Sequence, residues 1–231
     1  MEILSDKNNL ESLSCAQGSA CQFMGEITQL RQEVNSLTEL VRTDALTGLF
    51  NFRFFNENLE LEMERTRRSA QSLSMIILDI DYFKKFNDQW GHEIGNHALV
   101  HIAKLIKLAI RKLDLPCRFG GEEFVILLPN TQLHQAINVA SRLCEMIAGT
   151  ALELENTQKI TITASLGVDQ FGVHNNETTE AFIRRVDSWL YKAKNAGRNQ
   201  VAHPDLIALQ QKESVTLEEK DALFNLLNDN L

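Results

Sequence analysis

The sequence lacks the patterns that mark several large classes of protein. Its four cysteines, Cys15, Cys21, Cys117 and Cys144, include no Cys-x-x-Cys pair and no histidine cluster beside them, which argues against a structural zinc site. There is no basic-then-apolar leader and no run of roughly eighteen apolar residues, so we expect a cytoplasmic chain without a transmembrane segment. No Walker motif is present, so phosphates would be held by a metal and side chains rather than by a P-loop.

The charge balance excludes one class of partner. A formal net charge of -8 argues against broad binding of duplex nucleic acid, which needs a basic surface to displace counterions. A small polyanionic substrate held by a local metal and a few Lys or Arg side chains remains compatible with this charge. With 231 residues, 44% of them hydrophobic, the chain can bury one core and still have length for extensions.

The hydrophobic pattern divides the chain into four segments. Residues 1–19 are polar and predict a flexible N-terminal segment. Residues 20–42 carry apolar residues at alternating steps of three and four, which favours a coiled-coil stalk that makes a homodimer over an amphipathic helix packed on its own domain. Residues 43–203 form the main domain. The extension 204–231 places several leucines and a phenylalanine on one helical face, which fits a helix packed back on the domain or a partner-binding helix.

The main domain alternates strands with helices, which predicts an α/β (α+β) fold with a single mixed β-sheet flanked by helices. The continuous apolar run at 74–81 is typical of a strand buried on both faces. A turn is expected at 91–96 and a further strand at 160–168. Helical spacing predicts four helices: one at residues 52–68, a long core-facing helix from Leu99 to Leu113, a helix of about four turns that ends at Gly149, and one at residues 179–196. In the last of these, Trp189 is expected to point inward and Gly197 to act as the C-cap.

Two acidic turns are the first candidates for chemistry. The Gly120–Gly121 pair predicts a tight hairpin that Glu122 and Glu123 follow at once, and Asp79 ends the buried strand. A solvated hairpin tip and a helix N-cap are the plainer interpretations. If the hairpin lies beside the strand, three carboxylates meet, and their repulsion calls for a hard cation such as Mg²⁺ or Mn²⁺. This is the layout of metal-assisted phosphoryl or nucleotidyl transfer.

Lys194 and Arg198 lie four residues apart at the end of the last predicted helix. They could simply complement the helix dipole. They could also bind the outer phosphates of a nucleotide, because a Lys point charge and an Arg fork are both suited to that role.

Five ordered motifs in residues 43–202 together resemble the GGDEF domain of diguanylate cyclases, in its GGEEF form. The motifs are Asp44 to Asn51, Asp79-Ile80-Asp81 with Phe83-Lys84, Gly91-His92, the Gly120-Gly121-Glu122-Glu123-Phe124 hairpin, and Lys194 to Asn199. The resemblance implies a fold similar to the palm of nucleotide polymerases and class III cyclases. It also implies that two GTP-loaded domains face each other in a dimer and form cyclic di-GMP and two pyrophosphates.

The resemblance assigns roles residue by residue. Asp79, the Ile80 carbonyl, Glu122 and Glu123 would hold Mg²⁺, and Glu122 would also be the base. The nucleotide would be bound by side chains and backbone groups of Phe83, Lys84, Asn87, His92, Lys194 and Arg198. Outside this site, Arg111 and Asp114 resemble the RxxD product-inhibition motif, with Arg142 as its helper, although an i,i+3 pair of this kind is also common at helix ends.

Asn96 departs from the family pattern, which usually has Asp there to accept two N–H groups of guanine. An asparagine amide presents a mismatched donor to one of them, so relaxed purine specificity is an alternative to strict use of GTP. A catalytically silent relative that binds cyclic di-GMP and signals by contact is another alternative, and a purely structural coiled-coil adaptor is a third. Because segment 1–19 is too short to build a sensory domain, we expect a separate regulatory protein to bind the stalk or the N-terminal segment.

Overall fold

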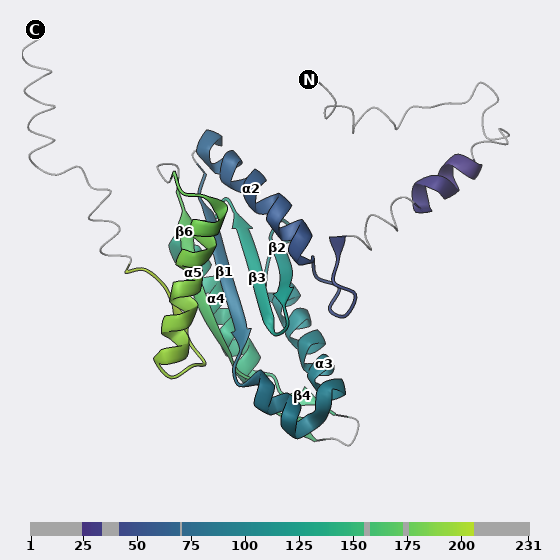
Figure 1. Ribbon diagram of the computed structural model, residues 1–231, viewed down its shortest axis with the longest axis vertical. Coiled ribbons are helices and arrows are strands. Elements are labelled where there is room, and N and C mark those ends of the chain that lie inside the picture. The colour runs from purple at the N-terminus through teal and green to yellow at the C-terminus, as the bar shows by residue number, and fades with distance from the viewer. Residues whose placement is uncertain (1–24, 34–41, 70, 155–157, 173–175, 206–231) are drawn as a thin grey trace, which may run out of the picture. The chain divides into compact units, whose positions relative to one another are not determined.

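The structure is a computed structural model that describes residues 25–33, 42–69, 71–154, 158–172 and 176–205 (Figure 1). The predictions for segment 1–19, for most of the stalk and for the extension beyond Asp205 lie outside these residues. The chain divides into two compact units at Arg42 and Thr43. In the first unit residues 25–33 are helical, and two residues of the predicted seam, Ile27 and Leu30, are exposed. Pairing of this helix with a second copy stays a prediction.

The second unit is built around a five-stranded sheet with strand order β2-β3-β1-β6-β7. All neighbouring strands are antiparallel except β6 and β7, which are parallel. The strands of this sheet are β1 (Leu73–Ile80), β2 (Leu115–Gly120), β3 (Glu123–Pro129), β6 (Ala164–Phe171) and β7 (Val201–Ala202). A separate two-stranded sheet joins β4 (Leu152–Glu153) to β5 (Lys159–Ile160).

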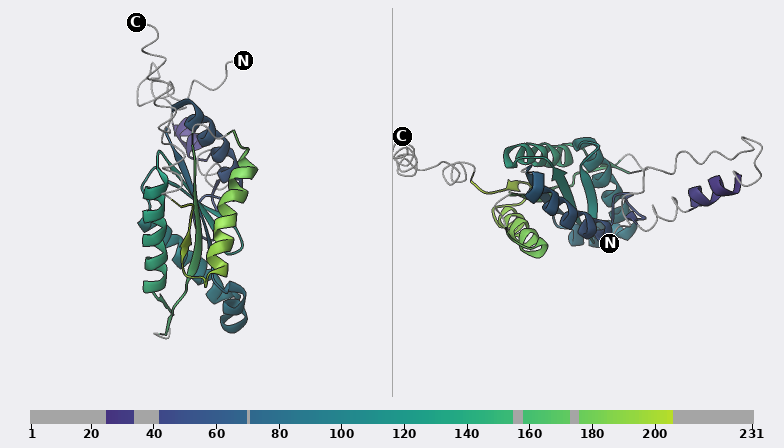
Figure 2. Two further views of the ribbon diagram at one scale, coloured as in Figure 1. Left: turned by 90° about the vertical axis from the view of Figure 1, so that its left-hand side faces the viewer. Right: turned by 90° about the horizontal axis from the view of Figure 1, so that it is seen from above.

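Helices cover both faces of the sheet, as the two views of Figure 2 show. They are α2 (Phe52–Ser69), α3 (Phe83–Ala109), α4 (Leu133–Gly149) and α5 (Thr179–Asn195). Successive residues of β1 point to opposite faces. Ile76 and Leu78 join the core beneath α3 and α4, whereas Met75 and Ile77 join the core beneath α2 and α5. The predicted α/β fold and the doubly buried strand are therefore confirmed.

The predicted end of the long helix is wrong. Helix α3 ends at Ala109, and Leu113, expected to face the core, is 81% exposed. The side chain of Asp114 explains the early end, because its carboxylate accepts the backbone N–H of Arg111 at 2.7 Å and closes a local turn. Such side-chain bonds to nearby backbone compete with helix continuation.

Two further boundaries differ from the prediction. The turn expected at 91–96 reduces to Gly91, whose φ of 82° and ψ of 160° kink α3 while the helix resumes after it. The strand expected at 160–168 is divided, because Ile160 pairs in the small sheet and β6 begins only at Ala164. Helix α5 ends at Asn195, one residue earlier than predicted, and its C-cap is Ala196 rather than Gly197, which follows at a φ of 119°. Trp189 is half-buried and donates its Nε1–H to Asp169 at 3.0 Å.

Candidate active site

The register of β1 and β3 brings two carboxylates opposite each other. Asp79, the penultimate residue of β1, pairs with Glu123, the first residue of β3. Gly121 makes the intervening turn possible with a φ of 47°, a conformation that a glycine adopts without steric cost. The backbone N–H of Ile80 donates to the carbonyl of Glu122 at 3.4 Å, so the two acidic turns lie side by side as the sequence predicts.

The charge on these carboxylates is only partly compensated. Burial raises the pKa of Asp79, and the ion pair with Lys194, with 2.9 Å between Nζ and Oδ2, offsets part of that rise. Burial also raises the pKa of Glu123, and the negative charge of Asp79 raises it further. An additional cation at this edge of the sheet would stabilise the ionised form of both side chains.

The donors at this edge suit a hard divalent cation by their chemistry. Carboxylate oxygens are among the ligands that Mg²⁺ and Mn²⁺ prefer, and Asp79 and Glu123 supply them here. Within the described part of the chain, no group of three or more His, Cys, Asp or Glu side chains is close enough to hold a metal ion. Asp79 and Glu123 therefore form the core of a candidate site, and its remaining ligands stay a prediction.

Arg198 lies beside Tyr82, the residue between β1 and α3. Its guanidinium sits 4.4 Å from the centre of the Tyr82 ring and donates to the phenol oxygen at 3.1 Å. The positive charge of Arg198 also acts to lower the pKa of Asp79, in the same direction as that of Lys194. Two cationic side chains thus flank the acidic pair, and sequence reasoning missed Tyr82 because nothing in its surroundings marks it.

The N-terminus of α3 faces the same edge of the sheet. The first helical bond runs from the Phe86 N–H to the Tyr82 carbonyl, and no side chain caps this end. The N–H groups of Phe83 and Lys84 therefore have no acceptor within the helix. Such a helix end favours an anion through its free N–H groups and its dipole. Phe83 is buried and Lys84 is exposed, so only the latter has its side chain free in solvent.

The kink at Gly91 brings Asn87 against the second half of α3. Among the described residues, Asn87 Oδ1 is a buried side-chain oxygen without a hydrogen-bond partner. A Cβ atom placed on Gly95 would lie only 1.9 Å from it. His92 and Asn96 are exposed on the same stretch of helix. Gly95 therefore makes room for the Asn87 carboxamide, a constraint that the sequence did not reveal.

Arg111, Asp114 and Arg142 lie near the C-terminal end of α3, the first two in the turn before β2 and the third on α4. Asp114 is buried, and burial raises the pKa of its carboxyl although the Arg111 N–H bond counteracts this. The Arg111 side chain is exposed. Arg142 of α4 donates to the carbonyl of Ala109, the last residue of α3. The structure thus places Arg142 at the helix end two residues before Arg111.

Arg118 braces the hairpin, a role that the sequence analysis did not assign. Its guanidinium donates to the carbonyl of Gly121 at 2.8 Å and pairs with Asp44 Oδ2 at 3.2 Å. Burial alone would raise the pKa of Asp44, but hydrogen bonds from Thr47 and the Arg118 charge hold it below its usual range. The only sequence signal was an arginine two residues before the Gly-Gly pair.

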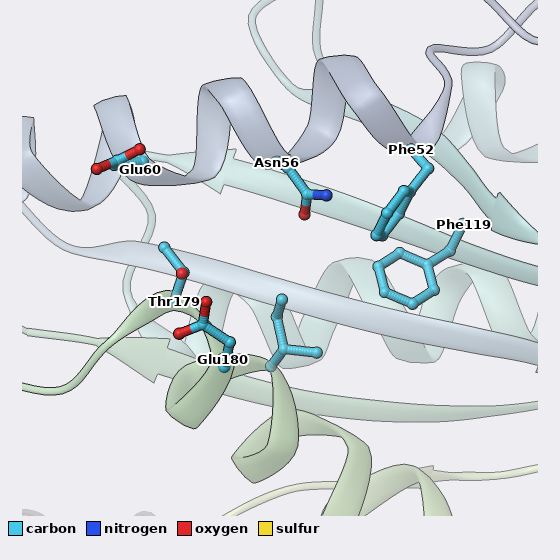
Figure 3. A pocket seen from close by; sticks show the side chains of 7 residues that line it. Phe52, Asn56, Glu60, Phe119, Thr179 and Glu180 are labelled. Carbon is cyan, nitrogen blue, oxygen red and sulfur yellow. The ribbon is translucent and has the colours of Figure 1, made fainter.

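A hollow of about 450 Å³ lies elsewhere, between α2 and α5 (Figure 3). Phe52 and Phe119 meet edge to face at its one end, with 4.9 Å between ring centres. Thr179 and Glu180 line it from the first turn of α5. None of the candidate nucleotide-binding residues lines this hollow.

No helix in the described part of the chain is long and apolar enough to span a bilayer.

Residues 41–200 match the family model described as "Diguanylate cyclase, GGDEF domain". The response regulator PleD of Caulobacter vibrioides is 35% identical over 201 residues, which cover 87% of this chain and 44% of PleD. The probable diguanylate cyclase DgcC of Escherichia coli K12 is 34% identical over 173 residues, which cover 75% of this chain and 46% of DgcC. The chain thus spans less than half the length of these curated relatives.

Two solved structures share the fold. Diguanylate cyclase SiaD of Pseudomonas aeruginosa, in complex with its activator SiaC, superposes with a TM-score of 0.70 and 37% identity over 79% of this chain and 69% of that one. The coiled coil and GGDEF domain of DgcB from Caulobacter crescentus, in complex with c-di-GMP, gives a TM-score of 0.73 and 26% identity over 78% of this chain and 95% of that one. Both agree with a central mixed sheet flanked by helices.

Proposed function

Because the chain belongs to the family of diguanylate cyclase GGDEF domains, we propose that it condenses two molecules of GTP into cyclic di-GMP and two pyrophosphates. The observation that supports this most is the meeting of Asp79 and Glu123, with Lys194 and Arg198 beside them. Oxygen donors for a metal and cations for phosphates at one sheet edge suit nucleotidyl transfer. The reaction proposed is Mg²⁺-dependent and takes place between two copies of the chain.

The side chains at this edge of the sheet have different roles in the proposed reaction. Glu122 accepts the proton of the attacking 3′-hydroxyl, and Asp79, Glu122, Glu123 and the Ile80 carbonyl would hold Mg²⁺ or Mn²⁺. When bound, the metal neutralises charge on the α-phosphate and the departing pyrophosphate. Lys194 then exchanges its contact with Asp79 for a phosphate oxygen, and Arg198 binds the outer phosphates. The free N–H groups of Phe83 and Lys84 add neutral donors.

Asn87, His92 and Asn96 line the pocket for the base in this proposal. We expect Gly95→Ala to raise the Kd for a non-reacting GTP analogue about tenfold, because the added methyl pushes the Asn87 carboxamide out of place. The free energy of unfolding should hardly fall, because the obstructing atom, Asn87 Oδ1, is the end of a side chain that can move. Ala also has a higher helix propensity than Gly. Isothermal titration and thermal unfolding measure the two effects.

The control for Gly95→Ala is the same change in an Asn87→Ala background. Without the carboxamide there is nothing to displace, so the second substitution should leave the Kd of Asn87→Ala unchanged. An equal loss of affinity in both backgrounds would show that Gly95 acts independently of Asn87, contrary to the proposal.

Asn96 sets the purine preference in this proposal. It accepts from one N–H of guanine and presents its own NH₂ to the other, so the enzyme should accept some ATP and form a minor mixed cyclic dinucleotide. Replacing Asn96 with Asp should increase the preference for GTP over ATP by about tenfold or more. Mass analysis of products from an equimolar GTP and ATP mixture checks this. Pure cyclic di-GMP from the unmodified chain would contradict it.

Product feedback is proposed at Arg111, Asp114 and Arg142. The exposed Arg111 side chain is free to meet a phosphate, and the Asp114 carboxylate fixes the backbone of the same turn. Arg142 approaches the turn from α4 through its bond to Ala109. Cyclic di-GMP bound there would slow the enzyme when product accumulates.

We further propose that the stalk makes the homodimer and that a separate protein regulates it. Ile27 and Leu30 present exposed apolar side chains on the described helix, as a dimer seam requires. The SiaD structure contains an activator protein, which supports regulation by a separate protein, and the DgcB structure includes a coiled coil, which supports a coiled-coil stalk.

A catalytically silent, cyclic di-GMP-binding module is the second candidate, favoured only by the Arg111 turn. Release of pyrophosphate from GTP and Mg²⁺ separates it from the cyclase. The purified chain should release pyrophosphate in proportion to GTP consumed, one for each GTP. Tight binding of cyclic di-GMP with no pyrophosphate release would favour the silent module. A chain that neither binds cyclic di-GMP nor releases pyrophosphate would favour a structural adaptor.

A further inference from the structure

Asp81 is the second carboxylate of the Asp79-Ile80-Asp81 turn, and it is bound differently from the first. Its side chain is 8% exposed. Oδ1 accepts the hydroxyl of Ser165 at 2.7 Å, and Oδ2 accepts the hydroxyl of Thr163 at 2.8 Å and the backbone N–H of Asn199 at 3.0 Å. Both oxygens are therefore engaged by neutral hydroxyl and backbone donors, whereas Asp79 forms an ion pair with Lys194.

One of these donors belongs to a strained turn. Arg198 and Asn199, between α5 and β7, both adopt left-handed backbone conformations, with φ of 64° and 47°. This conformation is sterically unfavourable for an arginine and, to a smaller extent, for an asparagine. The Arg198 N–H bonds to the carbonyl of Ala193 at 3.1 Å, and the Asn199 N–H bonds to Asp81. The turn thus depends on bonds that offset its strain.

Asp81 also holds the residue that Arg198 contacts. Tyr82 follows Asp81 directly and is itself left-handed, with a φ of 57°. The Asp81 backbone N–H bonds to the Thr163 carbonyl at 2.9 Å and so fixes the chain just before Tyr82. Figure 1 shows that the end of β1, the start of α3 and the end of α5 lie at the same end of the sheet. One residue therefore anchors the backbone on both sides of the Arg198–Tyr82 pair.

We infer that Asp81 is a positioning residue that holds the Arg198–Asn199 turn, and with it the Arg198 guanidinium, in place for the phosphates of a nucleoside triphosphate. This inference rests on the proposed function for the identity of the ligand. It separates the two aspartates of the motif, since Asp79 faces the metal and substrate while Asp81 acts through Arg198.

The first test does not depend on any nucleotide. In Asp81→Ala, which leaves no side-chain acceptor, the amide hydrogen of Asn199 should exchange with solvent at least tenfold faster than in the unmodified chain, measured by NMR hydrogen exchange. The matched control is Ser165→Ala, which removes a bond to the same carboxylate but leaves the Asn199 bond in place, and its Asn199 exchange should stay slow. Unchanged exchange in Asp81→Ala would overturn the anchoring role.

The second test measures the Kd of a non-reacting GTP analogue. Asp81→Ala should raise it about tenfold, and the double variant with Arg198→Ala should bind no more weakly than Arg198→Ala alone. The Mg²⁺ concentration for half-maximal binding should not change. Adding Asn199→Gly to Asp81→Ala should restore affinity, because glycine adopts the left-handed conformation without strain.

The same rescue keeps the test decisive if Asp81→Ala alone fails to fold, because the Asp81→Ala/Asn199→Gly chain is relieved of that strain and should bind the analogue normally. An increased Mg²⁺ requirement would overturn the inference and indicate a metal ligand instead. Additive losses with Arg198→Ala, or no rescue by glycine, would overturn it by showing that Asp81 does not act through the turn. If the unmodified chain does not bind the analogue, the proposed function fails, and the exchange experiment still decides whether Asp81 holds the turn.

Discussion

Asp79→Asn should lower the rate of pyrophosphate release from GTP by about 10³-fold, with far-UV circular dichroism unchanged. The carboxylate is the most rigidly held oxygen donor of the site, at the end of the buried strand β1 and opposite Glu123. Asn retains the shape but loses the charge that a divalent cation requires. Interactions that stabilise charge in the transition state commonly contribute effects of this size.

The difference in stability between Asp79→Asn and the wild type should depend on pH. Burial raises the pKa of Asp79 above its ordinary value of 3.8, so the fold disfavours the ionised form. The contribution of Asp79 to the free energy of unfolding of the wild type is therefore fully present at acidic pH, and it is lost as the pH rises through the raised pKa. The neutral Asn variant should therefore be at least as stable as wild type at pH 7, with the difference shrinking below pH 3.8, as urea unfolding at several pH values measures.

Glu153→Gln is the matched control for Asp79→Asn, because it also turns a carboxylate into an amide. Glu153 is exposed on β4 and pairs with Lys159 at 2.8 Å, an ion pair that includes none of the candidate site residues. Its substitution should leave pyrophosphate release unchanged, since exposed pairs contribute little. Retention of a tenth or more of the wild-type rate by Asp79→Asn would contradict the assigned role.

Gly167→Ala should destabilise the domain by about 3 kcal/mol, the largest stability effect that we expect from one methyl group. A Cβ atom at this position of β6 would lie 2.3 Å from the backbone nitrogen of Leu190 and 2.6 Å from the carbonyl oxygen of Val186. Both atoms belong to the backbone of α5, which cannot swing aside as a side chain can. Because α5 carries Lys194, its displacement should also weaken nucleotide binding.

Gly149→Ala provides the comparison for Gly167→Ala. A Cβ atom on Gly149, the last residue of α4, would meet no atom within 4 Å. Its substitution should change the free energy of unfolding by less than about 1 kcal/mol. Urea unfolding of both variants gives the two values, and equal stabilities would mean that α5 is not packed against β6 as closely as described.

Periodicity and turn chemistry predicted the strongest elements from the sequence. The apolar run before Asp79 indicated a doubly buried strand and the Gly-Gly pair indicated a hairpin, so their pairing and the approach of Glu123 to Asp79 could be anticipated. The predicted end of α3 failed because one side chain, Asp114, bonds to a nearby backbone N–H, a local competition that hydrophobic spacing does not record.

The contacts that organise the site join residues far apart in the sequence, and no local pattern reveals them. Arg118 lies 74 residues from Asp44, and Asp81 lies 118 residues from Asn199. The small space around Gly95 is likewise defined by a side chain eight residues earlier and by a kink that only the folded helix shows. Such pairings depend on the packing of complete elements, so they follow from the fold rather than from spacing.

The most direct measurement is mass analysis of the products that the purified chain forms from GTP and Mg²⁺, alongside Glu122→Gln. The proposed mechanism predicts cyclic di-GMP with two pyrophosphates per product from the unmodified chain, and a loss of product of at least about 10²-fold in Glu122→Gln, whose fold should be intact. Unreacted GTP with the unmodified chain, or equal amounts of cyclic di-GMP from both proteins, would contradict the assignment of the acidic edge as the catalytic site.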